Sequence, residues 1–168
     1  LGEGATSRVY LAVHAVIGKR VAVKMMHRHL LDNEQIVRRF VAEARATHEV
    51  RHPNIVELLD IGTTKDDRPY IIMEPLEGQT LGAAAADRSL ALEEAARIVL
   101  QVCEAVHAAH GRGVIHRDLK PDNIYLAQGV DGSVRVKVMD FGIARREALE
   151  PGEQRTAAGM ILGNSLLT

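Results

Sequence analysis

Hydrophobic residues in the first third of the chain are spaced first as in strands and then as in a helix. Residues 8–16 and 19–26 are apolar runs rich in β-branched residues, and the turn at residues 17–20 between them predicts a β-hairpin. From residue 34 to residue 50 the apolar positions recur every three or four residues, which predicts an amphipathic helix. Pro53 ends that pattern, because the residue before a proline disfavours helical geometry.

The rest of the pattern is mainly helical. Apolar residues form one long stripe from residue 92 to residue 109, which predicts a helix that ends at Gly111. Cys103 lies on this stripe, so we expect it to be a buried and inert core residue. A small sheet with one helix would therefore be joined to a helical part, and a ligand cleft is expected between the two. The shorter predicted elements are strands at residues 55–61, 70–73, 124–127 and 134–139, a linker at 75–78, a short helix at 83–86 and a loop from 145 onward.

Composition narrows the classes of protein that fit this pattern. The 168 residues are 46% hydrophobic, which is enough for a domain with its own core. Lys and Arg number 21 and Asp and Glu 22, so the net charge of −1 gives no reason to expect nucleic acid or a membrane surface as a partner. The single cysteine excludes an internal disulfide and fits a reducing compartment such as the cytoplasm.

The ends of the sequence predict a fragment. The chain has no initiator Met and opens inside a glycine-rich pattern. No apolar run approaches the roughly 20 residues of a membrane span. A membrane anchor elsewhere in the parent protein therefore stays open.

A glycine-rich stretch and a lysine at the end of a strand are the first candidates for chemistry. Gly2 and Gly4 begin Gly-Glu-Gly-Ala-Thr-Ser-Arg-Val, where backbone N–H groups could close on phosphate oxygens, although an ordinary β-turn would look the same. No Gly-Lys-Ser/Thr follows, which excludes a Walker P-loop. Lys24 ends Val-Ala-Val-Lys and is either a solvated edge charge or a phosphate-binding ammonium. The second role needs an acidic partner, for which Glu43 on the predicted helix is the candidate.

The densest polar stretch is His-Arg-Asp-Leu-Lys-Pro-Asp-Asn at residues 116–123, and Asp-Phe-Gly follows a strand at residue 140. Asn123 and Asp140 offer the hard oxygen ligands that suit Mg²⁺. Asp118 could accept a hydroxyl proton, and Lys120 could neutralise charge on a phosphoryl group. Each piece alone could be a solvated loop, but their combination in this order favours a site for phosphate and metal.

These motifs together resemble the catalytic domain of eukaryotic-type serine/threonine protein kinases, and the residues around them are similar to those of bacterial members. Lys24 follows Gly2 by 22 positions and Glu43 follows Lys24 by 19, which resembles the spacing of that family. The resemblance implies a bilobal, protein-kinase-like α+β fold, truncated in the C-lobe. A small β-rich N-lobe with one helix would span residues 1–75, and a mainly helical partial C-lobe residues 76–168.

The resemblance also implies a role for each matching catalytic residue. Gly2 and Gly4 would cover the phosphates of ATP, and Lys24, paired with Glu43, would hold them. The remaining assignments are Asp118 as the residue that orients and deprotonates the substrate hydroxyl, Lys120 beside it as the serine/threonine signature, and Asn123 and Asp140 as ligands of Mg²⁺ or Mn²⁺.

Two further groups of residues follow from the same resemblance. Adenine would be enclosed by Met73 as gatekeeper, the backbone of Glu74 and Leu76, Val9 and Ala22 above the ring, and Tyr125 below it. A stacked regulatory spine would consist of His116, Phe141, Leu58 and Thr47.

Regulation would pass through Arg117, which precedes the catalytic aspartate. Phosphorylation of Thr156 would supply the negative partner that orders the activation loop against this arginine, although Thr156 could equally be an unmodified loop residue. The chain departs from the family at Asn164, where a threonine is usual, and it stops before Ala-Pro-Glu. We therefore expect the 168-residue chain alone to be inactive.

The implied function is transfer of the γ-phosphoryl group of ATP to Ser or Thr hydroxyls of proteins. The implied partners are ATP, a protein substrate and a second kinase copy for autophosphorylation, without nucleic acid or membrane contact. One alternative is a small-molecule phosphotransferase of the same fold, against which Arg117 and Lys120 count. The other is a non-catalytic pseudokinase or ATP-binding module, against which the presence of Lys24, Asp118, Asn123 and Asp140 counts.

Overall fold

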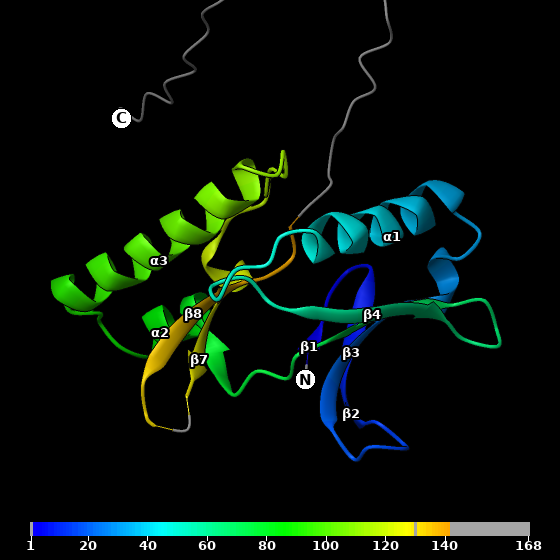
Figure 1. The fold of residues 1–168 in the computed structure, drawn as a ribbon, viewed down its shortest axis with the longest axis horizontal. Coiled ribbons are helices and arrows are strands. Elements are labelled where there is room, and N and C mark those ends of the chain that lie inside the picture. The colour runs from blue at the N-terminus through cyan, green and yellow to red at the C-terminus, as the bar shows by residue number, and fades with distance from the viewer. Residues whose placement is uncertain (1, 130, 142–168) are drawn as a thin grey trace, which may run out of the picture.

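Two β-sheets, each with its own helices, make up the fold (Figure 1). The computed structural model describes residues 2–129 and 131–141. Figure 1 shows the strands β1 to β5 and α1 on one side and α2, α3 and the strands β7 and β8 on the other. In chain order the elements are β1 (Gly2–Glu3), β2 (Ser7–Val13), β3 (Arg20–Met26), η1 (Arg28–Leu30), α1 (Glu34–His48), β4 (Leu58–Thr63), β5 (Pro69–Met73), β6 (Gly78–Thr80), α2 (Leu81–Asp87), α3 (Leu92–His110), η2 (Pro121–Asn123), β7 (Ile124–Gln128) and β8 (Val134–Val138).

The first sheet is antiparallel, with the strand order β1-β2-β3-β5-β4. In its register Lys24 of β3 pairs with Val9 of β2, and Ala22 pairs with Met73 of β5. Directly opposed residues of an antiparallel pair point to the same face, and residues two apart on one strand do so as well. The register alone therefore gathers Val9, Ala22, Lys24 and Met73 on one face of the sheet.

Helix α1 packs against β4 and β5 of this sheet. Asn33 caps its start, since the side-chain oxygen accepts a hydrogen bond from the backbone N–H of Ile36 at 3.2 Å. The helix ends at His48, five residues before Pro53, so the predicted helix at residues 34–50 is confirmed with a slightly earlier end. The buried core between α1 and the sheet consists of Met26, Phe40, Ala44, Val56, Leu58 and Ile71.

The second sheet, β6-β7-β8, packs against α3. Ile98, Val102, Ala105 and Ala109 of α3 recur at helical spacing and are buried against this sheet. The expectation of a buried Cys103 is wrong, because its side chain is exposed on the neighbouring face of the helix. Three other apolar residues of that part of α3, Leu92, Val99 and Leu100, are 86%, 59% and 61% exposed. The apolar stripe of α3 is thus wider than the surface that the described residues bury.

The segment before β4 joins the two halves of the molecule. The predicted strand at residues 55–61 begins only at Leu58, because the preceding residues pair with β8. Ile55 forms a parallel bridge with Val138, and the backbone of Val138 donates to Asn54 at 2.8 Å. The Asn54 amide is buried, donating to the carbonyl of Val136 at 2.9 Å and to the Gln101 side chain at 2.8 Å.

Most other differences from the expected elements lie at their ends. Strand β2 stops at Val13, because His14 begins a turn in which the backbone of Gly18 donates to its carbonyl at 2.9 Å. The predicted linker at residues 75–78 runs into β6, which was not expected. The loop expected from residue 145 onward lies outside the described residues, and the lobe boundary between residues 75 and 76 stays a prediction.

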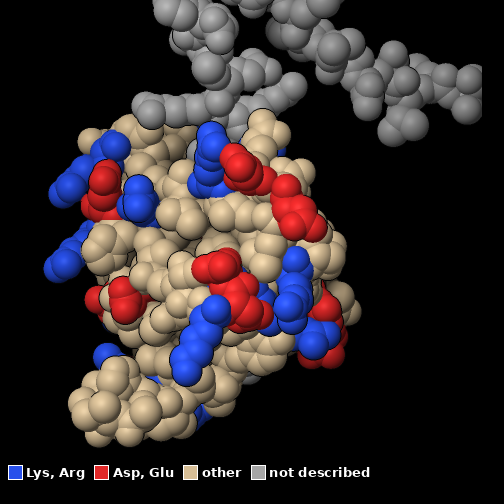
Figure 2. Space-filling view, turned by 90° about the vertical axis from the view of Figure 1, so that its right-hand side faces the viewer, with Lys and Arg blue, Asp and Glu red and all other residues tan. Residues whose placement is uncertain are grey.

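The surface fits the balanced composition. Figure 2 shows acidic and basic side chains interspersed over one face of the molecule, without a broad field of one sign on that face. None of the helices among the described residues is long and apolar enough to cross a membrane.

Asn54 provides a test of the junction between the two halves. Replacing it by Leu leaves the buried carbonyl of Val136 without the Asn54 donor, while Oε1 of Gln101 keeps its hydrogen bond from the backbone N–H of Val136. We therefore expect Asn54→Leu to lower the free energy of unfolding by about 2 kcal/mol. Urea unfolding followed by circular dichroism measures this change. Gln79→Leu, at an exposed amide on β6, is the control and should shift stability by less than about 0.5 kcal/mol. Equal effects of the two substitutions would contradict the role assigned to Asn54.

Candidate active site

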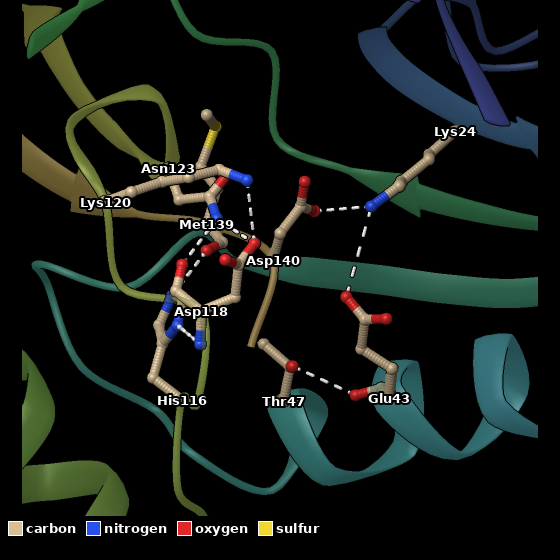
Figure 3. A network of polar contacts seen from close by, with 9 residues as sticks. All are labelled: Lys24, Glu43, Thr47, His116, Asp118, Lys120, Asn123, Met139 and Asp140. Carbon is tan, nitrogen blue, oxygen red and sulfur yellow. Dashed lines mark hydrogen bonds and ion pairs between the residues drawn. The ribbon is translucent and has the colours of Figure 1, made fainter. Parts of the chain in front are cut away.

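Lys24 brings the two halves of the molecule together at one point (Figure 3). Its Nζ atom lies 2.5 Å from Oδ1 of Asp140, a residue 116 positions later that follows β8. Oε1 of Glu43, on α1, lies 4.0 Å from the same nitrogen. Glu43 is therefore near Lys24, as the sequence predicts, but Asp140 makes the tighter ion pair.

Burial dominates the electrostatics of Glu43. Removal of its carboxyl from water raises the pKa of Glu43 to about 7, against the opposing effect of the Lys24 ammonium, while Asp140 adds a smaller rise. One lysine thus faces two acids, and the more exposed of them, Asp140, holds it more closely.

His116 fixes the start of the polar loop at residues 116–123. Its Nε2 donates to the carbonyl of Met139 at 2.9 Å, so Nδ1 is free to accept from the backbone N–H of Asp118 at 3.3 Å. The ring also lies 4.7 Å, between centroids, from that of Phe141. His116, Phe141, Leu58 and Thr47, the expected spine residues, are all buried.

Asp118 is held by two neighbours in the same loop (Figure 3). Its Oδ2 accepts from Nζ of Lys120 at 2.9 Å and from Nδ2 of Asn123 at 3.1 Å. The hydrogen bond from Lys120, with that from Asn123 in support, holds the pKa of Asp118 below its usual range and raises the pKa of Lys120. Nδ2 of Asn123 also donates to the backbone carbonyl of Asp118 at 2.8 Å, which directs its amide N–H groups toward Asp118.

A cavity of about 240 Å³ opens beside these groups. Tyr125 lies on its wall with its ring fixed, because its hydroxyl donates to the carbonyl of Gly78 at 2.8 Å. Gly4 does not line the cavity. Instead, its N–H donates to the carbonyl of Ser7 at 2.9 Å, and its own carbonyl contacts the His27 ring. The cavity is lined by Gly2, Val9, Ala22, Lys24, Val56, Met73, Glu74, Leu76, Thr80, Tyr125, Met139 and Asp140.

Two residues of the site have unusual backbone geometry. Arg117 has φ of 63° and Asp140 has φ of 52°, in the left-handed region that residues with a Cβ rarely adopt. Such strain is found where surrounding bonds over-determine the conformation, often at functional sites. Here Arg117 adjoins Asp118 and Asp140 adjoins Met139, and hydrogen bonds of the His116 ring join Asp118 to Met139.

The sequence matches the protein kinase domain family over residues 1–159. The chain belongs to the protein kinase family. Among curated relatives, it is 47% identical over 164 residues to the serine/threonine-protein kinase Pkn1 of Myxococcus xanthus, covering 97% of this chain and 23% of the relative. It is 38% identical to the serine/threonine-protein kinase PrkC of Bacillus subtilis, covering 86% of this chain and 22% of that protein. The chain thus spans less than a quarter of the length of these two proteins.

A solved kinase structure agrees with the fold. A double mutant of the PknI kinase domain of Mycobacterium tuberculosis superposes with a TM-score of 0.73 at 30% sequence identity, covering 88% of this chain and 58% of that one. The expected resemblance to bacterial serine/threonine kinases and the protein-kinase-like α+β fold are confirmed by these matches.

The candidate site also contains residues that the sequence pattern does not single out. Val56, Thr80 and Met139 line the cavity, although none of them carries a motif that would single it out. Thr80 caps α2, where its hydroxyl accepts from the N–H of Ala83 at 3.1 Å. A polar residue at the start of a short Ala-rich helix was the one signal that could have drawn attention to Thr80. Thr156 and Asn164 lie outside the described residues.

The pKa of Glu43 gives a prediction for stability. Its value in the folded protein, about 7, lies above the reference value of 4.5, so the folded state binds this proton more tightly than the unfolded state. The stabilisation from this group is complete below pH 4.5 and is lost as the pH rises through 7. Glu43→Gln cannot ionise, so its free energy of unfolding should rise relative to the wild type by up to about 3 kcal/mol over that range.

Urea unfolding of both proteins at intervals from pH 4.5 to pH 8 measures this difference. A difference that stays constant with pH, or that shrinks as the pH rises, would contradict the assignment of a desolvated carboxyl to Glu43.

Proposed function

We propose that the protein is a serine/threonine protein kinase that transfers the γ-phosphoryl group of ATP to Ser and Thr hydroxyls of proteins. The observation that carries this proposal is the ion pair of 2.5 Å between Lys24 and Asp140 at the wall of the cavity. The pair supports the proposal because Lys24, the cation proposed to bind phosphate, lies next to Asp140, the carboxylate proposed to bind metal, although they come from different halves of the fold. Asp118, the proposed proton acceptor, lies in the same network (Figure 3).

The cavity suits a nucleotide base. In the proposed complex, Val9 and Ala22 contact one face of adenine and Tyr125 the other, with Met73 at the back. The backbone of Glu74 and Leu76 offers the polar groups that the base edge requires. Lys24 and Gly2, on the same lining, would then lie toward the phosphates.

Asp140 on the cavity wall and Asn123 in the neighbouring loop fit a magnesium ion. Asn123 directs its amide nitrogen to Asp118, which leaves Oδ1 as the oxygen for a cation, and Asp140 presents a carboxylate that is 47% exposed. An amide oxygen and a carboxylate form the small oxygen set that Mg²⁺ uses together with substrate phosphates. When bound, the ion would neutralise charge on the phosphates.

Asp118 would act on the attacking hydroxyl. Its lowered pKa keeps it ionised near neutrality, and Oδ2 already accepts two hydrogen bonds, so Oδ1 is the oxygen proposed to accept the proton. Lys120, bound to the same carboxylate, brings a positive charge to the place where negative charge builds up during transfer.

The substrate and the cellular setting extend this proposal. The curated relatives are named serine/threonine-protein kinases, which supports a protein hydroxyl as the acceptor. Autophosphorylation between two copies, with Thr156 as an acceptor that pairs with Arg117, belongs to the proposal. So does a cytoplasmic location, which the single cysteine of the chain supports.

Substitution of Asp118 tests the function. In the protein at its natural length, Asp118→Asn should reduce the rate of phosphate transfer to a Ser/Thr peptide library by roughly 10²–10⁴-fold, because the proton acceptor is lost. Binding of a fluorescent ATP analogue should change by less than about threefold. Transfer of radioactive phosphate from labelled ATP and a fluorescence titration provide the two measurements.

Asp122→Asn, in the same loop, is the matched control and should retain transfer within about threefold of the wild type. A wild-type protein that binds the analogue without phosphorylating any peptide would favour the non-catalytic ATP-binding module. Transfer to small hydroxyl compounds but not to peptides would favour the small-molecule phosphotransferase.

A further inference from the structure

A second ion pair lies at the wall of the cavity. Nζ of Lys137, on β8, is 2.5 Å from Oε1 of Glu74, the residue that follows β5. The Lys137 side chain is 13% exposed and that of Glu74 25%, so the pair is largely withdrawn from water. No catalytic step proposed above uses either charge.

Glu74 is also bound through its backbone, and the carboxylate oxygen that contacts Lys137 accepts a second hydrogen bond. Its Oε1 accepts from the backbone N–H of Glu57 at 2.8 Å, and its own N–H donates to the carbonyl of Glu57 at 3.0 Å. Lys137 makes a further contact of 3.4 Å to the carbonyl of Ile55. One carboxylate oxygen therefore joins three segments: the end of β5, the segment before β4, and β8.

This junction adjoins the cavity. Glu74 and Leu76 line the cavity through the segment between β5 and β6, which links the two sheets. Lys137 stands three positions before Asp140 on the strand that leads to it. The pair thus ties the wall proposed to bind the base to the strand that carries the proposed metal ligand.

We propose that Glu74 and Lys137 are positioning residues that hold the backbone of residues 74–76 in the geometry that binds the nucleotide. This inference rests on the proposed function, since it assigns the two residues to the same ATP site. A base is bound alike before and during phosphate transfer, so a loss of preorganisation here weakens binding in both states. The pair therefore acts on the KM for ATP and leaves kcat nearly unchanged.

Lys137→Met, in the protein at its natural length, is the central experiment. It keeps the length of the side chain and removes the charge, so the KM for ATP should rise about tenfold because the wall must be ordered on binding. The value of kcat at saturating ATP should stay within about twofold. Glu74→Gln, which retains an oxygen for the Glu57 N–H, should raise KM in the same direction, and the double variant should add little to either single effect.

Two further variants separate positioning from general stability. Lys137→Arg retains a cation for Glu74 and should restore the KM to within about threefold of the wild type. Arg20→Met removes a pair of 3.1 Å with Glu77, in the same region but 55% and 70% exposed, and should change KM by less than about twofold.

The outcomes distinguish this inference from the proposed function. If the wild type binds ATP and Lys137→Met lowers the thermal midpoint and kcat with an unchanged KM, the pair is only structural and the inference is wrong. An increase in KM with Arg20→Met equal to that with Lys137→Met would overturn it as well. If the wild type itself neither binds nor uses ATP, the proposed function fails, and this inference fails with it.

Discussion

The active site depends on the hydrogen bonds between the segment before β4 and strand β8. The two sheets share no strand, so neither sheet can place the other. The bridge between Ile55 and Val138 and the buried amide of Asn54 provide backbone and buried contacts that help to fix their relative position. Val138 is fully buried and stands two residues before Asp140, so whatever holds Val138 also sets where Asp140 meets Lys24.

The charges around Lys24 follow from that placement. A lysine that is 14% exposed needs an anion, and the fold offers two, one on α1 and one after β8. Glu43 is the more desolvated of the two and therefore gives up its charge more easily, while Asp140 keeps contact with water. A cation that binds Asp140 would compete with Lys24 for this carboxylate, which would leave Lys24 to Glu43 and to the phosphates. Lys24 could thus exchange Asp140 for Glu43 as its acidic partner without movement of a strand.

Local patterns predicted the elements well and their tertiary partners poorly. The helical spacing in α1 and α3, and the apolar runs in β3, β5, β7 and β8, are local signals, and each element formed close to its expected bounds. Ile55 and Val56 are β-branched and look like the start of β4, but their backbone bonds to β8 instead. That choice depends on a strand about 80 residues away, which no local pattern records. The prediction that Cys103 is buried failed for a related reason, because periodicity shows that a helix face is apolar but not what covers that face.

The same division holds for the site residues. Linear motifs identify the chemically active residues Gly2, Gly4, Lys24, Asp118, Asn123 and Asp140. In the structure Gly2, Lys24 and Asp140 line the cavity, Asp118 and Asn123 lie in the hydrogen-bonded loop beside it, and Gly4 lies outside it. Val56, Thr80 and Met139 are cavity residues because of where the backbone passes. Their side chains are ordinary, so only the folded arrangement can assign them.

The left-handed backbone at Arg117 and Asp140 shows how firmly the loops are held. Each such residue costs roughly 1–3 kcal/mol, which a loop free in solvent would release by relaxing. His116 prevents this, because it binds the carbonyl of Met139 on one side and the N–H of Asp118 on the other. The backbone N–H of Met139 in turn donates to the carbonyl of Asn123 at 2.9 Å, which closes the connection between the two loops. The strain is therefore maintained by bonds that run between the Asp118 loop, Asn123 and the segment of Met139 and Asp140, so the groups proposed for proton and metal binding keep their relative positions before any substrate binds.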